Sequence, residues 1–357
     1  MPSPAIPASL RFSAPAAALK PLPRHEPLAF QTRDGLVESV HYGSLIATTP
    51  DGSTILSVGE PHVAFYPRSS LKPLQAVAMV RAGLNLPADL LALTAASHSG
   101  AAVHRDGADR ILQLHGLTAA ALENSSDLPY GVSEREEWLR DGGLPTQITQ
   151  NCSGKHAAMA ATCLINGWSV QGYLDPRHPL QKLVAETVTE LTGEEPSGIS
   201  TDGCGTPLFA LTLAGMARAF GRLASAELPD GASAPGSPEA VVAHAMRKHP
   251  EMVAGEGRDV TELMRLMPGL LAKDGFEGIQ VVGLPDGRAI ALKISDGGDR
   301  ARMPVTVRAL EALDVDTAPL AGIATAPVLG GGRPVGVLTA TEFPAAGFIP
   351  VQATNAL

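Results

Sequence analysis

Charged residues are scarce in this 357-residue chain, at 18% of the total, and three further absences narrow its class. It has no run of lysine or arginine and a formal net charge of −9, so we expect no nucleic-acid partner. No stretch approaches the roughly 20 apolar residues of a membrane span. Three cysteines are too few, and odd in number, for a disulfide framework, which favours a reducing compartment. These absences predict a soluble, cytoplasmic protein without a membrane partner.

The first 26 residues differ in composition from the rest of the chain. They are rich in proline, alanine and serine, and prolines interrupt each apolar run, so the segment is a poor signal peptide and is predicted to be a disordered leader. Hydrophobic residues make up 45% of the whole chain, which is typical of a globular protein with a core.

Two hairpin signals, one near each end, bracket a long middle with helical spacing. Residues 44–49 and 53–58 flank Pro50-Asp51-Gly52, and residues 278–284 and 288–295 flank Pro285-Asp286-Gly287. Apolar residues recur at helical intervals over 180–191, 208–220 and 263–270. We therefore predict an α/β protein of the α+β sandwich kind. An antiparallel sheet from both chain ends is flanked by helices, and a mostly helical lobe forms a cleft with it.

The run Ser69-Ser70-Leu71-Lys72 precedes Pro73, which is tolerated only in a first helical turn, so a helix is predicted to start here. Ser69 and Lys72 then share one helical face. A lysine amine near the positive helix N-terminus can act as the base that activates a serine hydroxyl, and free N–H groups there can hold an oxyanion. The alternative is an N-capping serine beside a solvated lysine.

Two more polar runs follow in order. Ser97-His98-Ser99-Gly100 ends an apolar run and offers two hydroxyls and an imidazole, although turn-forming serines explain it equally well. Lys273-Asp274-Gly275 brings an ammonium to the start of the late hairpin. The order S-x-x-K, S-x-S, K-x-G resembles that of serine β-lactamases and penicillin-binding proteins.

Two loops carry cysteines beside other polar groups. Asn151-Cys152-Ser153-Gly154-Lys155-His156 opens an alanine-rich helix, and Thr201-Asp202-Gly203-Cys204-Gly205-Thr206-Pro207 is expected to precede another. Two thiolates and an amine could share a zinc ion, although lysine is a rare ligand because it must first lose its proton. The alternative is a pair of small buried thiols. Cys163 lies mid-helix and is predicted to be core.

Together these runs resemble the asparaginase II family, the rhizobial-type or class 3 L-asparaginases. The combination of Cys-Ser-Gly-Lys-His with Asp-Gly-Cys-Gly is the most specific part of the resemblance. The matching runs are 37–43, 67–76, 97–100, 151–156, 202–205, 249–250 with 255–258, and 273–278. The resemblance implies a single domain over residues 27–340, with a C-terminal tail at 341–357.

The resemblance implies hydrolysis of L-asparagine to L-aspartate and ammonia on a serine-β-lactamase-like fold, in a homodimer. It implies two Ser–Lys pairs, with Ser69 as the nucleophile and Lys72 as its base, and with Ser97 and Lys273 assisting proton transfer. Other side chains would line the substrate pocket, namely Arg68, His156, Asp202 and Gly203. A Zn²⁺ ion in a supporting role would be held by Cys152, Lys155 and Cys204.

Three residues depart from the family pattern. Tyr42 stands where a basic residue is usual, and Asp274 and Phe276 stand where small residues are usual. A carboxylate beside Lys273 would raise the pKa of that lysine. Two other functions are considered. One is a related serine amidase, such as a glutaminase or a β-lactam-binding enzyme. The other is a non-catalytic, zinc-stabilised amino-acid-binding protein.

Overall fold

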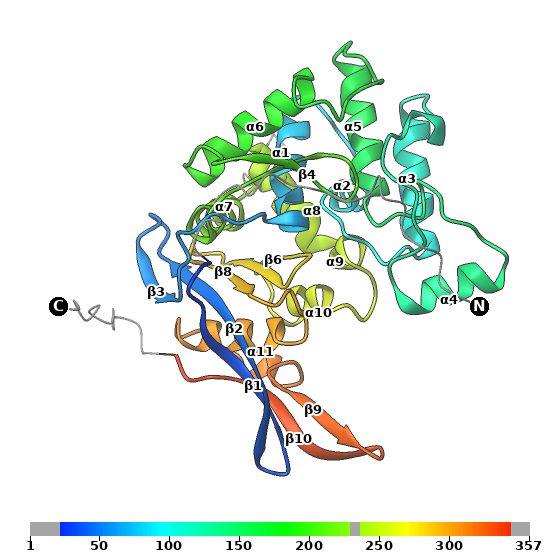
Figure 1. The fold of residues 1–357 in the computed structure, drawn as a ribbon. Helices are drawn as coiled ribbons and strands as arrows, with labels where there is room; N and C mark the ends of the chain where they lie inside the picture. The colour runs from blue at the N-terminus through cyan, green and yellow to red at the C-terminus, as the bar shows by residue number, and fades with distance from the viewer. Residues whose placement is uncertain (1–21, 229–235, 344–357) are drawn as a thin grey trace, which may run out of the picture.

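The computed structural model describes residues 22–228 and 236–343, and its centre is an eight-stranded antiparallel sheet (Figure 1). The strand order is β6-β7-β8-β2-β1-β10-β9, and β3 pairs with β2. The strands are β1 (Glu26–Arg33), β2 (Leu36–Thr48), β3 (Thr54–Val58), β6 (Leu271–Gly275), β7 (Ile279–Gly283), β8 (Ala289–Ile294), β9 (Ala326–Gly330) and β10 (Arg333–Ala340).

Both predicted hairpins are confirmed. β2 pairs with β3 across the Pro50-Asp51-Gly52 turn, and β7 pairs with β8 across the Pro285-Asp286-Gly287 turn. The first half of β2 pairs with β1 and its second half with β8, so the two chain ends join one sheet. Gly43 lies where these pairings meet. A Cβ atom there would lie 2.3 Å from the Lys293 carbonyl oxygen, so only glycine fits.

Helices cover the sheet and form a separate lobe (Figure 1). Helix α7 packs on β2, β7 and β8, whereas α11 packs on β8, β10 and β1. The helices are α1 (Lys72–Arg81), α2 (Ala88–Thr94), α3 (Ala102–Leu114), α4 (Val132–Arg140), α5 (Ser153–Ile165), α6 (Pro179–Thr192), α7 (Leu213–Ser225), α8 (Pro238–Lys248), α9 (Pro250–Val253), α10 (Asp259–Leu266) and α11 (Arg302–Glu311), with short 3₁₀ turns at η2 (Arg68–Leu71), η3 (Ala119–Ala121) and η4 (Ala318–Leu320). The predicted antiparallel sheet with flanking helices and a helical lobe is confirmed.

Helices α1 and α5 form the centre of the lobe. Residues 72–79 of α1 and 153–163 of α5 are all buried. Small alanine side chains let neighbouring helices approach closely, and a Cβ atom at Gly154 would lie 2.7 Å from the Leu93 carbonyl oxygen. The polar residues at the start of each helix are therefore held in a rigid, desolvated environment.

One predicted helix begins later than its apolar pattern suggested. Residues 207–209 form strand β5 (Pro207–Phe209), which pairs with β4 (Ile199–Thr201), and α7 starts only at Leu213. The physical reason is that Thr212 caps α7, because its side chain accepts a hydrogen bond from the Gly215 N–H. The loop bearing Asp202 and Cys204 is thus the turn of a hairpin and not a helix start.

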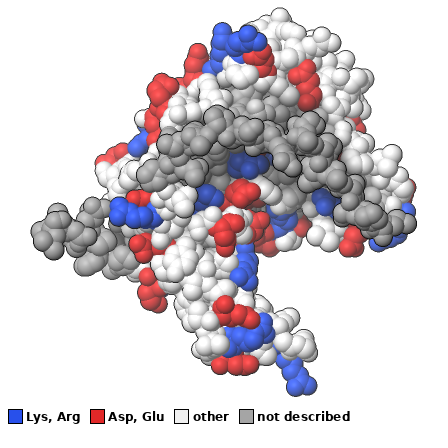
Figure 2. Space-filling view, viewed as in Figure 1, with Lys and Arg blue, Asp and Glu red and all other residues white. Residues whose placement is uncertain are grey.

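Parts of the predicted leader and tail lie outside the described residues. Residues 1–21 and 344–357 are in this group. Within the described remainder of the leader, Arg24 contacts Glu60 and Glu26 opens β1. No helix among the described residues is long and apolar enough to cross a membrane. Acidic and basic side chains are interspersed over the described part of the face in Figure 2, so this face presents both signs of charge.

We predict that Gly283→Ala destabilises the contact between α7 and the sheet. The added Cβ atom would lie 2.3 Å from the Phe220 carbonyl oxygen, and neither backbone can move freely. Overpacking of this kind lowers the free energy of unfolding by about 1–3 kcal/mol, measurable by urea denaturation. Gly322→Ala is the control, because no atom lies within 4 Å of its Cβ position. Equal losses in both variants would contradict the prediction.

Candidate active site

The predicted nucleophile lies at the junction of η2 and α1. Ser69 is in the 3₁₀ turn, and Pro73 occupies the first turn of α1, as predicted. The adjacent Ser70 is buried and donates a hydrogen bond of 2.7 Å to the Pro67 carbonyl oxygen, whereas Ser69 is partly accessible. Arg68 has a φ of +51°, a conformation that is uncommon for a residue other than glycine and that often occurs at functional sites.

Two buried lysines converge on one hydroxyl group. Lys72 Nζ lies 3.0 Å from Ser97 Oγ and also donates to the Ala96 carbonyl oxygen at 2.6 Å. Lys273 Nζ lies 3.1 Å from the same Ser97 Oγ. All three side chains are buried. The structure therefore brings together three of the four predicted catalytic side chains through direct hydrogen bonds.

The segment that carries Ser97 is fixed by its backbone. The Ser97 and Ser99 N–H groups donate to the Val253 and Ala254 carbonyl oxygens at 2.9 and 2.8 Å, and the His98 N–H donates to Asn151. Strand β6 delivers Lys273 from the other side. Chain segments from α1, α2, α9 and β6 thus meet at this hydroxyl, and no local sequence pattern joins them.

The fourth predicted catalytic side chain, Ser69, forms no side-chain hydrogen bond with the lysine that was expected to activate it. Among the described residues no hydrogen bond joins the side chains of Ser69 and Lys72, because Lys72 Nζ is directed to Ala96 and Ser97. Sequence spacing placed Ser69 and Lys72 on one face, but the carbonyl oxygen at the end of α2 is a nearby buried acceptor that the spacing could not reveal. The role of Ser69 as nucleophile stays a prediction.

Lys273 has a carboxylate as its immediate neighbour. Its Nζ donates to Asp274 Oδ1 and, at 3.0 Å, to the Asp274 carbonyl oxygen. Asp274 Oδ2 lies 3.5 Å from Arg258. Burial lowers the pKa of Lys273 to about 8, with the nearby Lys72 lowering it further and the Asp274 carboxylate opposing both. The contribution of Arg258 is a feature that the sequence analysis missed, although Arg258 lies within a run that matched the family.

The predicted substrate-binding residues Arg68 and Asp202 form an ion pair. Arg68 Nε lies 2.7 Å from Asp202 Oδ1, and the Gly203 N–H donates to the same oxygen at 2.9 Å. The Arg68 guanidinium also lies over the Phe276 ring, 5.1 Å from its centroid. One positive and one negative group therefore lie side by side near the start of α1.

The two cysteine loops meet around Lys155. Its buried Nζ donates to Cys204 Sγ at 3.1 Å and to Thr206 Oγ1 at 3.0 Å. The pKa of Cys204 is held well below its usual value by the neighbouring Cys152 side chain and by the Lys155 ammonium, although burial acts in the opposite direction. Cys204 is therefore the group in this cluster that ionises more readily. The neighbouring Cys204 and burial raise the pKa of the Cys152 thiol well above its usual value.

His156 lies behind this cluster, fully buried. Its Nδ1 is 2.9 Å from the Tyr173 hydroxyl, and its Nε2 has no hydrogen-bond partner among the described residues. Burial lowers the pKa of His156 to about 4, so the imidazole is neutral at physiological pH. Its predicted contact with substrate stays a prediction, and the Tyr173 contact was not foreseen.

The cysteine cluster can be tested for its fit to a metal ion. Within residues 22–228 and 236–343, no group of three or more His, Cys, Asp or Glu side chains is arranged to hold one. The set Cys152, Lys155 and Cys204 counts two sulfurs and one amine, and the unpaired His156 Nε2 lies beside them. This donor chemistry suits zinc. Although burial favours the neutral amine, the Cys204 thiolate raises the pKa of Lys155, so a metal would have to displace that proton.

The comparisons with known proteins agree with the resemblance seen in the sequence. Residues 29–340 match the model of the family described as L-asparaginase II. The chain belongs to this family. A comparison with curated proteins gives no match.

Solved structures with some similarity include those of Mglu and EstCE1. Mglu in its native form aligns with a TM-score of 0.42 at 14% identity, over 76% of this chain and 64% of that chain. Mglu in its native form in 4.3 M NaCl gives 0.35 at 16%, over 81% and 66%. EstCE1, a hydrolase with promiscuous acyltransferase activity, gives 0.33 at 13%, over 75% and 88%. This asparaginase II family member spans 64% and 66% of those two Mglu chains.

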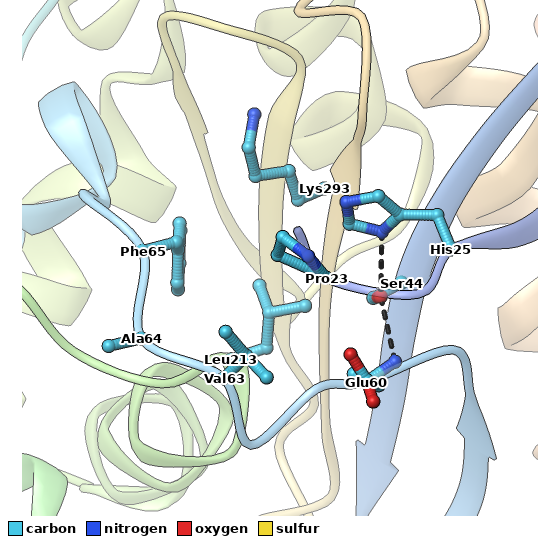
Figure 3. A pocket seen from close by; sticks show the side chains of 9 residues that line it. All are labelled: Pro23, His25, Ser44, Glu60, Val63, Ala64, Phe65, Leu213 and Lys293. Atoms are coloured by element: carbon cyan, nitrogen blue, oxygen red, sulfur yellow. Dashed lines mark hydrogen bonds between the residues drawn. The ribbon is translucent and has the colours of Figure 1, made fainter. Parts of the chain in front are cut away.

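A surface pocket of this family member is lined by residues other than Lys72 and Lys273. Figure 3 shows His25 Nδ1 bonded to Ser44 Oγ at 2.9 Å, and Ser44 Oγ accepting a hydrogen bond from the Glu60 N–H. The lining is completed by Pro23, Val63, Ala64, Phe65, Leu213 and Lys293. None of the predicted catalytic, substrate-binding or metal-binding residues lines this pocket, so it is not where the predicted chemistry would occur.

We predict that Cys204→Ala destabilises the protein, because it removes a partner of the buried Lys155 ammonium. The substitution leaves the buried ammonium with Thr206 as its remaining side-chain partner. Removal of one member of a buried charge pair lowers the free energy of unfolding by about 3–5 kcal/mol, measurable by urea denaturation with a chelator present. The double variant Cys204→Ala/Lys155→Met should recover much of that loss, because no uncompensated charge remains. Losses that simply add would contradict a Lys155–Cys204 pairing.

Proposed function

We propose that the protein is an L-asparagine amidohydrolase that releases L-aspartate and ammonia through a lysine-activated serine. The observation that carries this proposal is the convergence of Lys72 and Lys273 on Ser97 Oγ, in a buried site one helical turn from Ser69. Buried amines that contact a hydroxyl can accept and return protons without a histidine base. Family membership supports the asparaginase class, and the lysines supply a chemical route for it.

The ion pair between Arg68 and Asp202 supports an amino acid as the substrate. A guanidinium can hold an α-carboxylate in a bidentate manner, and a carboxylate can hold an α-ammonium. Arg68 and Asp202 are paired with each other at 2.7 Å. A zwitterionic substrate would replace that ion pair by two, one between Arg68 and the α-carboxylate and one between Asp202 and the α-ammonium. The side chain between these two charges would then extend toward Ser69, the residue next to Arg68.

In the proposed reaction, Ser69 Oγ bonds to the side-chain amide carbon of the substrate as Lys72, which must be in its neutral amine form, takes the hydroxyl proton. The positive end of the α1 dipole would stabilise the negative charge that develops on the amide oxygen. The C–N bond then breaks, the leaving nitrogen takes the proton that Lys72 had accepted and departs as ammonia, and an ester remains on Ser69. Water hydrolyses the ester to L-aspartate, and Ser69 regains its proton. Ser97 is hydrogen-bonded to both Lys72 and Lys273, and Ser97 and Lys273 would assist proton transfer at Lys72.

A zinc ion in a supporting role is part of the proposal. Cys152, Lys155 and Cys204 would hold it, and when bound it would supply positive charge and rigidity beside the Asp202 loop. Cys204 is two residues from Asp202, so a metal ion that fixes the position of Cys204 would also restrict the position of the Asp202 carboxylate. A homodimer and a cytoplasmic location, both expected from the sequence, remain part of the same proposal.

We predict that Ser69→Ala lowers kcat for ammonia release from L-asparagine by about 10⁴-fold or more, because the nucleophile is lost. Ser70→Ala is the matched control. Ser70 is the next residue and is buried, but its hydroxyl is already bonded to Pro67, so that variant should keep most of its turnover. Mass spectrometry of the trapped acyl-enzyme should place the modification on Ser69. An acyl group on Ser97 would contradict the assignment of the nucleophile.

The same variants separate the other candidate functions. Turnover of L-asparagine, L-glutamine and a chromogenic β-lactam is compared side by side, and the proposal requires L-asparagine to have the highest kcat/KM. A binding protein without catalysis would show ligand-induced stabilisation in Ser69→Ala and no ammonia release from the unsubstituted chain.

We predict that the purified protein binds zinc in close to equimolar amount, with an affinity that falls as the pH falls because Lys155 must lose a proton. Metal content is measured by elemental analysis after dialysis at several pH values. Cys152→Ser should lose the metal. Cys163→Ser should retain it, since that thiol is buried on the same helix, α5, outside the cluster. Equal metal loss in both variants, or no zinc in the unsubstituted protein, would rule out the assigned ligands.

A further inference from the structure

Asp274 is a buried carboxylate on strand β6, next to Lys273 in the sequence. Its side chain contacts the Lys273 ammonium through Oδ1 and lies 3.5 Å from Arg258 through Oδ2. Only 8% of the residue is exposed. Adjacent residues of a strand normally point to opposite faces, so a contact between neighbours on β6 is not a default of the strand. The Asp274 side chain therefore has a specific orientation toward Lys273.

The charges around Asp274 keep it ionised. Burial raises the pKa of a carboxyl group, but the Lys273, Arg302 and Arg258 cations together hold the pKa of Asp274 well below its usual range. A lysine that faces a permanent carboxylate keeps its proton to higher pH than one that does not. The pKa of Lys273, about 8, includes this opposing effect of Asp274 against burial and Lys72.

The two lysines at Ser97 differ in this respect. Both Nζ atoms lie within 3.1 Å of one oxygen, so two positive charges there would repel each other in a buried site. Lys273 has a carboxylate partner, whereas Lys72 has only the Ala96 carbonyl oxygen and Ser97 among the described residues. The asymmetry of partners fixes where a shared proton resides.

We propose that Asp274 is a positioning residue that keeps the proton on Lys273 and directs that ammonium at Ser97 Oγ, so that Lys273 acts as a hydrogen-bond donor and not as a base. The inference rests on the proposed amidohydrolase reaction for its kinetic consequence. The charged or titratable groups that face the pair are Lys72 from α1, Tyr130 from the loop before α4, Arg258 at the start of α10, and Arg302 from α11.

The test is the pH dependence of kcat/KM in Asp274→Asn. Without the carboxylate Lys273 loses its proton at lower pH, so the alkaline limb should move down by about one unit or more, which is about a tenfold loss of kcat/KM at high pH. The α-ammonium of the substrate also titrates at alkaline pH, but its contribution to the pH profile is the same for all variants. Asp274→Glu should restore part of the shift. If the acid limb moves down and the alkaline limb does not, Lys273 acts as a base and the proposal is overturned.

Asp299→Asn is the matched control. Asp299 also pairs with Arg302, at 3.0 Å, so this variant removes one negative charge from the same cluster without a contact to Lys273. Its pH profile should match that of the unsubstituted protein, and an equal shift in Asp299→Asn would overturn a specific role for Asp274. Asp274→Ala, which also removes the carboxylate, provides a second variant if Asp274→Asn fails to fold.

A second readout does not depend on turnover. In protein with ¹³C-labelled lysine, the Lys273 Cε resonance, assigned from Lys273→Arg, is titrated by NMR. The midpoint should fall in Asp274→Asn and stay unchanged in Asp299→Asn. An unchanged midpoint in Asp274→Asn overturns the inference even if asparagine is hydrolysed. A lowered midpoint in a protein that hydrolyses no asparagine supports the effect of Asp274 on the proton and rejects the proposed function separately.

Discussion

Two buried lysine side chains whose Nζ atoms contact one hydroxyl oxygen determine how the sheet and the helical lobe are arranged. Lys72 and Lys273 are both removed from water, and each must find acceptors within the protein. The Ala96 carbonyl oxygen serves Lys72, and the Asp274 carboxylate and carbonyl oxygen serve Lys273, with Ser97 shared between them. The end of α2, the first turn of α1 and strand β6 must therefore meet at one point, so the sheet and the helical lobe cannot be arranged independently.

A similar requirement organises the cysteine loops. Lys155 lies in the first turn of α5, fully buried, and the Cys204 thiolate on the β4–β5 hairpin neutralises it. Because Asp202 lies two residues from Cys204, the same hairpin carries the carboxylate that pairs with Arg68. His98 connects the two regions, since its Nε2 lies 2.9 Å from the hydroxyl of Ser153, the residue between Cys152 and Gly154. The segment that carries Ser97 and the segment that carries Cys152 are thus held together by a side-chain hydrogen bond.

Local chemistry made several elements predictable. Proline, aspartate and glycine at both turns specified the two hairpins, and Pro73 specified where α1 begins. The start of α7 was less predictable, because Leu208 and Leu211 fit the apolar spacing of a helix although residues 207–209 lie in a strand. Apolar spacing reports burial, and both a buried strand and a buried helix satisfy it. The cap at Thr212, which decides the boundary, is a weaker signal in the sequence.

The sequence by itself determined the architecture of hairpins around a helical middle, the family, and the set of side chains that could carry chemistry, because these depend on turn residues, periodicity and short motifs. Only the tertiary structure decided the partners: that Lys72 contacts Ser97 and not Ser69, that Asp274 turns toward Lys273, and that Lys155 contacts Cys204. Lysine side chains are long and rotatable, and their partners are 25 and 49 positions away for Lys72 and Lys155. A hydrogen bond in a desolvated site goes to whichever acceptor the packing brings within about 3 Å, and the spacing of residues along the chain does not contain that information.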